Sequence, residues 1–149
     1  MKSTILSLAA ILAAATALPT PLANAPTALW AVNEFSIYSS QSTRLASISF
    51  LTDAPATAGP TYQFHQCRGT MPADADGGVP AFVRIPCDDA GSTTFSFNPP
   101  TDDSKSAASL LIYAAGKTGV AMFNRKSLVF QDGTERWVGS ANFAISNIF

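Results

Sequence analysis

Residues 109–123 read SLLIYAAGKTGVAMF, two short apolar runs on either side of a glycine-containing stretch. Each run has the length of a strand rather than of a helix, and the β-branched and aromatic residues in them favour strands. Gly116-Lys117-Thr118-Gly119 is a turn signal between the two runs. This stretch therefore predicts a β-hairpin, and because both of its runs are apolar on both faces we expect them to be central strands.

A second hairpin follows toward the C-terminus. Asp132-Gly133 separates SLVFQ, a third candidate central strand at 127–131, from the final run WVGSANFAISNIF at 137–149. Gly139 interrupts that final run. A glycine inside a strand marks either a bulge or tight bend, or a place where small size is needed for packing, here beneath Trp137. The sequence leaves these two alternatives open.

Further strands are predicted toward the N-terminus by a period of two. In the first, Leu29, Ala31, Phe35 and Ile37 fall on one face and Trp30, Val32 and Tyr38 on the other. Later runs are marked by apolar residues between loop-like segments, namely Ala46-Ile48-Phe50, Tyr62-Phe64, Phe82–Ile85 and Phe95-Phe97. About nine or more short strands predict an all-β fold, a compact antiparallel barrel or sandwich. We place a single β-barrel domain at residues 29–149.

The first residues have the pattern of a secretory signal peptide. Residues 1–17, MKSTILSLAAILAAATA, combine a basic start at Lys2 with an apolar run too short to span a bilayer. Ala15-Thr16-Ala17 is the favoured cleavage site, and a second small-residue site at 23–25 is followed by Pro26. We expect residues 18–28 to be an extended lead-in and the protein to be secreted into the extracellular space, with no membrane insertion after cleavage.

Composition narrows the classes of partner. The chain has 149 residues, of which 47% are hydrophobic and 13% charged, and its net charge is −1. Ordinary domains carry about a quarter charged residues. A near-neutral chain without basic clusters is a poor ligand for nucleic acid or an anionic membrane, and its hydrophobicity argues against disorder. With 16 Ser and 14 Thr, the surface is expected to be coated by hydroxyl groups.

Cys67 and Cys87 are the only cysteines, with nineteen residues between them. An even number in a secreted chain predicts a disulfide bond. Closing a loop of this size stabilises a fold by roughly 3 kcal/mol in the chain-entropy treatment. Zinc binding is the weaker alternative, because the spacing is too long for a zinc motif and the chain has a single histidine.

Side chains that carry chemistry are few. Any catalytic triad would have to use His65, the only histidine, and the chain has no G-x-S-x-G motif. The acidic pairs Asp74/Asp76, Asp88/Asp89 and Asp102/Asp103 lie in loop-like segments, where aspartate is common for turn formation; weak metal binding and glycosidase-type acid–base chemistry are the alternatives. We predict no catalytic residue, cofactor or metal. Trp137 and His65 are the candidates for exposed recognition residues, with packing as the other role for Trp137.

Several segments together resemble a known family. These are Trp30-Ala31-Val32-Asn33-Glu34-Phe35, the strand ending SISF at 47–50, the two cysteines, and Phe95-Ser96-Phe97. They resemble the Alternaria major allergen-like family of small secreted fungal proteins. The resemblance implies a compact antiparallel β-barrel, a first strand built on Trp30, Glu34 and Phe35, and a Cys67–Cys87 bridge. The family typically has a second cysteine pair, which this chain lacks, so properties that depend on it are not carried over.

The resemblance also implies effector, elicitor or allergen proteins that act outside the cell at a plant or animal host, without an established enzymatic reaction. We therefore expect a non-enzymatic secreted protein that binds a host extracellular protein or a wall component. Two alternatives stay open. The first is a small-molecule carrier that uses the interior of a barrel. The second is an unrecognised hydrolase that uses His65 or an acidic pair.

Overall fold

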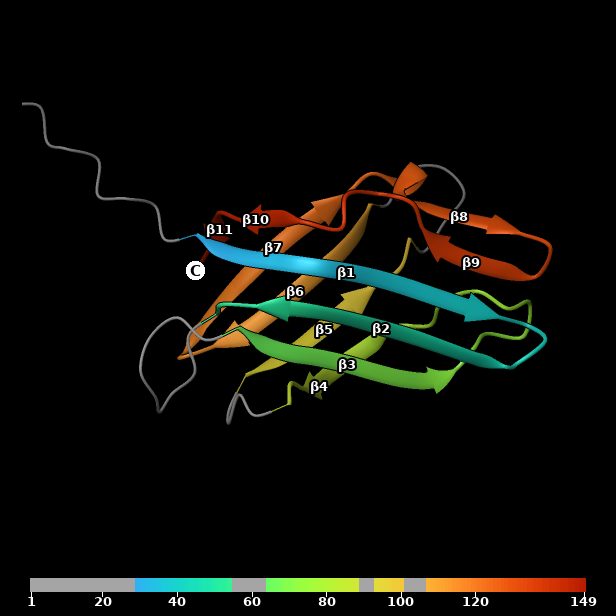
Figure 1. Ribbon diagram of the computed structural model, residues 1–149, viewed down its shortest axis with the longest axis horizontal. Helices are drawn as coiled ribbons and strands as arrows, with labels where there is room; N and C mark the ends of the chain where they lie inside the picture. Colours follow the sequence, from blue (N-terminus) through green and yellow to red (C-terminus); the bar gives the residue numbers. More distant parts are fainter. Residues whose placement is uncertain (1–28, 55–63, 89–92, 101–106) are drawn as a thin grey trace, which may run out of the picture.

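The computed structural model describes residues 29–54, 64–88, 93–100 and 107–149. These residues form an all-β fold in which two antiparallel sheets pack face to face, and the strands of one sheet cross those of the other (Figure 1). The predicted signal peptide and lead-in at 1–28 lie outside the described residues.

The six-stranded sheet has the order β3-β2-β1-β9-β8, with β10 also paired to β1. Its strands are β1 (Trp30–Ser40), β2 (Leu45–Thr52), β3 (His65–Pro72), β8 (Leu128–Gln131), β9 (Thr134–Trp137) and β10 (Phe143–Ile145). The five-stranded sheet has the order β11-β7-β6-β5-β4. Its strands are β4 (Phe82–Pro86), β5 (Thr94–Asn98), β6 (Ala108–Ala114), β7 (Lys117–Phe123) and β11 (Asn147–Ile148). A short 3₁₀ helix, η1 (Arg125–Ser127), connects β7 to β8.

The all-β prediction is confirmed, and of its two forms the sandwich is the correct one. A barrel needs a hydrogen-bonded ladder around its whole circumference. Among the described residues, β3 and β4 pair through a single isolated bridge between Cys67 and Cys87. The last two strands join different sheets, β10 the six-stranded and β11 the five-stranded one. The β-barrel placed at residues 29–149 is therefore wrong in its closure.

The predicted division of the side chains between the two faces of β1 is wrong, because this strand contains a bulge. Pairing with β2 shifts between Asn33 and Ser36, and Glu34 has a φ of 56°. One extra residue reverses which side chains face inward. Trp30 and Val32 therefore share the buried face with Phe35, instead of lying opposite to it. Tyr38, grouped with Trp30 by the strict period of two, points outward.

Both predicted hairpins are present. The first turn consists of Ala115 and Gly116, with φ of 48° and 75°, so Lys117 and Gly119 belong to β7 and not to the turn. Asp132 and Gly133, with φ of 52° and 69°, form the second turn. Two positive φ values match the right-handed twist of the flanking strands.

The expectation of central strands holds for only part of the chain. β6 lies inside the five-stranded sheet, and β7 lies between β6 and the two-residue β11. The run 127–131 forms β8, which is an edge strand, and its Phe130 is half exposed. Its apolar composition is typical of a central strand, but composition and periodicity do not determine where a strand lies in its sheet.

Gly119 in β7 allows the five-stranded sheet to pack closely against the six-stranded sheet. A Cβ atom at this position would lie 2.6 Å from Cε3 of the buried Trp30 ring and 3.1 Å from Ile145. We expect Gly119→Ala to lower the free energy of unfolding by about 1–3 kcal/mol, because the added methyl overpacks this contact. Urea denaturation measures the loss. Met122→Ala, at an exposed site on the same strand, is the control, and equal stability of the two variants would contradict the packing.

Candidate functional site

The residues that carry the family resemblance are almost all in the core. Trp30, Val32, Phe35, Phe95 and Phe97 are each at most 4% exposed. They fill the space between the sheets. Their role in this fold is therefore packing and not surface recognition.

Glu34 differs from the other residues of the resemblance because it is exposed at the bulge. Its backbone N–H donates to Oδ1 of Asn142 at 3.1 Å. This bond ties the bulge to the segment between β9 and β10, since the bulge removes that N–H from the regular ladder.

Trp137, one of the two predicted recognition residues, is half buried at the end of β9. Its ring meets Phe35 and Phe123 edge-on, with centroid distances of 4.9 and 4.8 Å, and its Nε1 donates to the carbonyl of Ser140 at 3.1 Å. Gly139 lies directly under this ring and leaves no room for a Cβ atom. Both roles considered for Gly139 are present, because the chain bends at Gly139 just after β9 ends and the glycine packs beneath the Trp137 ring.

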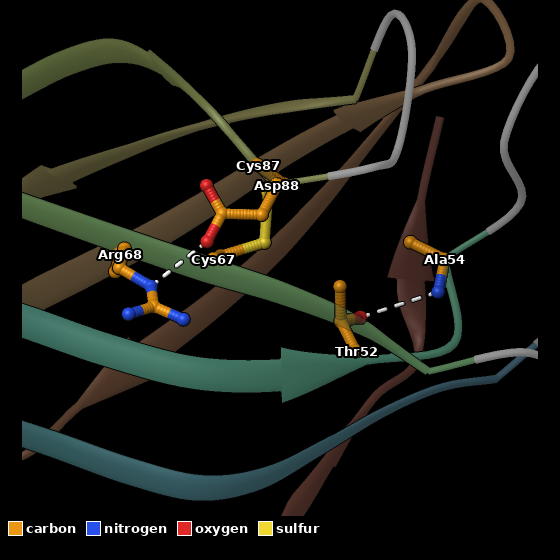
Figure 2. The surroundings of a disulfide bond; sticks show 6 residues. All are labelled: Thr52, Ala54, Cys67, Arg68, Cys87 and Asp88. Carbon is orange, nitrogen blue, oxygen red and sulfur yellow. Dashed lines mark hydrogen bonds and ion pairs between the residues drawn. A yellow bond between two sulfur atoms is a disulfide. The ribbon is translucent and has the colours of Figure 1, made fainter.

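His65, the other predicted recognition residue, begins β3 and is half buried opposite Thr52 of β2. The Thr52 hydroxyl accepts a hydrogen bond from the backbone N–H of Ala54 at 3.2 Å (Figure 2). That hydroxyl is therefore engaged in a local turn. The structure does not bring His65 and Trp137 together: they come from β3 and β9, which β2 and β1 separate.

The predicted disulfide is present and joins the edges of the two sheets (Figure 2). Cys67 belongs to β3, and Cys87 follows β4 directly. Beside it, Arg68 Nε lies 2.8 Å from Oδ2 of Asp88 in a half-exposed ion pair. Solvent-exposed ion pairs contribute little to stability, so the covalent bond is the main link at this edge.

The loop at 74–78 is held by turn hydrogen bonds. Asp76 Oδ1 accepts from the N–H of Gly78 at 3.1 Å, and the N–H of Asp74 donates to the Gly78 carbonyl at 3.1 Å. Glu135 of β9 accepts from the N–H of Val79 at 2.7 Å. Among the described residues, no group of three or more His, Cys, Asp or Glu could hold a metal ion. Asp89, Asp102 and Asp103 lie outside the described residues.

The space between the sheets is filled by phenyl rings. The centroid of Phe35 lies 5.8 Å from that of Phe50 and 6.5 Å from that of Phe97, and Phe50 lies 5.1 Å from Phe95. All four side chains are at most 2% exposed. In the described part of the fold, these four rings pack against one another between the two sheets.

The outer face of the six-stranded sheet presents a row of polar and aromatic side chains, which we call the Tyr38 row. Cross-strand pairing places Thr70, Ser47, Tyr38 and Arg136 next to one another on β3, β2, β1 and β9. All four are exposed, and the side chain of Tyr38 is 48% exposed. Beside the row, the hydroxyls of Ser36 and Ser49 lie 3.0 Å apart.

Sequence reasoning missed the Tyr38 row because the bulge at Glu34 was not foreseen. The signal that could have found it is a polar residue on each side of a buried isoleucine, Ser36-Ile37-Tyr38 in β1 and Ser47-Ile48-Ser49 in β2. An antiparallel sheet with one solvent-exposed face typically has polar residues on that face and apolar residues such as isoleucine on the face toward the core.

No helix among the described residues is long and apolar enough to cross a membrane. No family model, curated protein or solved structure matches the chain. The class is therefore defined by the fold itself, an antiparallel β-sandwich with a disulfide between its sheets.

Proposed function

We propose that this chain is a secreted, non-enzymatic binding protein that acts outside the producing cell, as a fungal effector, elicitor or allergen-like protein. Its partner is an extracellular protein of the host. The signal-peptide pattern, the resemblance to the Alternaria major allergen-like family and the disulfide support this proposal, since such bonds persist in oxidising extracellular environments.

The observation that carries the proposal is the Tyr38 row. Tyrosine and arginine are enriched among the residues that dominate binding energy at protein interfaces. In this row Tyr38 stands between Ser47 and Arg136 on an open sheet face, so one aromatic anchor is surrounded by hydroxyls and one cation. Because the chain has few charges that could attract a partner over a distance, recognition depends on direct contact with the Tyr38 ring and on hydrogen bonds from the groups around it.

We expect Tyr38→Ala to lower the amount of host protein captured from extracellular fluid by about tenfold or more. A truncated interface anchor of this kind costs about 2 kcal/mol or more of binding energy. The measurement is affinity capture on immobilised protein, followed by quantitative mass spectrometry. The same variant should weaken the defence response to infiltration into leaf tissue.

Met122→Ala is the matched control, because Met122 is exposed on β7 of the other sheet. It should capture the same host protein in the same amount as the unmodified chain. Capture that is equal for the unmodified chain and Tyr38→Ala would contradict the proposed surface, and no capture from any plausible host would contradict the function.

A further inference from the structure

The five-stranded sheet carries an open hollow of about 290 Å³ at the end where β6 turns into β7. It is lined by Arg84, Tyr113, Lys117, Thr118 and the turn residues at 114–116. Two of the described lining residues are cationic and none is acidic. Neither Arg84 nor Lys117 forms an ion pair with any residue in the part of the chain that the structure describes.

Arg84 reaches this hollow because β4 has a bulge. Pairing with β5 shifts between Phe82 and Ile85, and Arg84 has a φ of 52°, which is unusual for a residue with a side chain. Its backbone N–H donates to the hydroxyl of the buried Ser96 at 2.9 Å. Bulges re-aim side chains and are frequent beside functional sites.

The guanidinium of Arg84 is held over an aromatic ring. Its Cζ lies 3.3 Å from the centroid of Tyr113, the distance of a cation–π contact. Such a contact uses the face of the guanidinium and leaves the N–H donors at its edge for a ligand. The structure thus presents a positioned fork of donors, with a second cation, Lys117, lining the same hollow.

We propose that this hollow binds a carboxylate of an acidic polysaccharide, the class of polymer that carries uronic acids in walls. Arg84 matches a carboxylate with two parallel hydrogen bonds, and Lys117 supplies the second charge. Tyr113 and Thr118 also line the hollow, and their hydroxyl groups can form hydrogen bonds with sugar hydroxyls. Because the hollow is small and open rather than enclosed, it accepts one sugar unit of a chain that continues beyond it.

This inference rests on the extracellular site of action proposed above, and it assigns the wall component to a different surface from the host protein. The test is isothermal titration calorimetry of the purified secreted protein with an oligomer of galacturonic acid. Two further probes separate the sources of affinity: the fully methyl-esterified oligomer lacks the charge, and citrate carries carboxylates without a sugar chain. We expect binding of the acidic oligomer that weakens with salt, and little binding of the other two.

We expect the double variant Arg84→Ala/Lys117→Ala to bind the acidic oligomer about tenfold or more weakly, since hydrogen bonds to charged groups are lost. Arg84→Lys should fall between the two, because it keeps the charge and loses the fork. The matched control is Arg44→Ala/Lys126→Ala, which removes two exposed positive charges from the turn between β1 and β2 and from η1. It should bind the oligomer as the unmodified protein does.

Three results would overturn the inference: no binding of the acidic oligomer, equal loss in both double variants, or citrate binding as tightly as the oligomer. None of them bears on capture of a host protein through the Tyr38 row. Conversely, failed capture with intact oligomer binding would contradict the host-protein function and leave the hollow in place.

Discussion

Phe35→Ala is expected to lower the free energy of unfolding by about 3–5 kcal/mol, which is a large part of the total free energy of unfolding of a typical domain, about 5–15 kcal/mol. The Phe35 ring lies at the centre of an aromatic cluster whose members come from both sheets. Its centroid is within 6.5 Å of five other rings, those of Phe50, Phe97, Phe123, Trp137 and Phe143. Removing it leaves a cavity that rigid strands cannot close. Urea denaturation followed by tryptophan fluorescence measures the loss.

Phe130→Ala is the control for this prediction, because it makes the same chemical change at a half-exposed position on the edge strand β8. Its expected cost is below about 1 kcal/mol, as for a substitution outside the core. Phe35→Leu should fall between the two, since it keeps much of the volume. If Phe35→Ala and Phe130→Ala lost equal stability, Phe35 would not be at the centre of the core.

Replacing both cysteines by alanine is expected to cost about 3 kcal/mol. The bridge closes a segment with a sequence separation of 20, and its removal restores conformational freedom to the unfolded chain. It also removes the covalent link between β3 and the end of β4, where the described parts of the two sheets pair through one isolated bridge. The measurement is the urea midpoint of Cys67→Ala/Cys87→Ala against the oxidised protein.

Reductant supplies the internal check on the disulfide. It should lower the midpoint of the unmodified protein and leave that of the double variant unchanged. Asp88→Asn removes the neighbouring ion pair with Arg68 and should cost less than about 1 kcal/mol, because both side chains are half exposed. If Asp88→Asn lowered the free energy of unfolding as much as the double cysteine variant does, the ion pair and not the disulfide would stabilise this edge.

The features predictable from sequence were those fixed by local chemistry. Asp132-Gly133 satisfies the positive φ values of a two-residue hairpin turn, so its place could be read directly. The Cys67–Cys87 pairing followed from there being only two cysteines. The buried positions of Phe95 and Phe97 followed from alternation along a regular strand.

The features that were missed depend on neighbours distant in sequence. Glu34 and Arg84 both adopt positive φ although neither is a glycine, and the pairing partner of each strand decides where the bulge falls. The bulge at Glu34 hid the outward direction of Tyr38, and the bulge in β4 hid the contact of Arg84 with Tyr113. The edge position of β8 depends on the assembled sheet in the same way. For this reason the sequence named Trp137 and His65 as recognition candidates rather than Tyr38 or Arg84.

The most direct test of the proposed binding function is hydroxyl-radical footprinting of the protein in host extracellular fluid. Tyr38 and Met122 are both reactive side chains, and they are exposed on opposite faces of the sandwich. We expect oxidation of Tyr38 to fall several-fold when the protein fraction of the fluid is added, while oxidation of Met122 does not change. Unchanged oxidation of Tyr38, or protection of Met122 in its place, would contradict it.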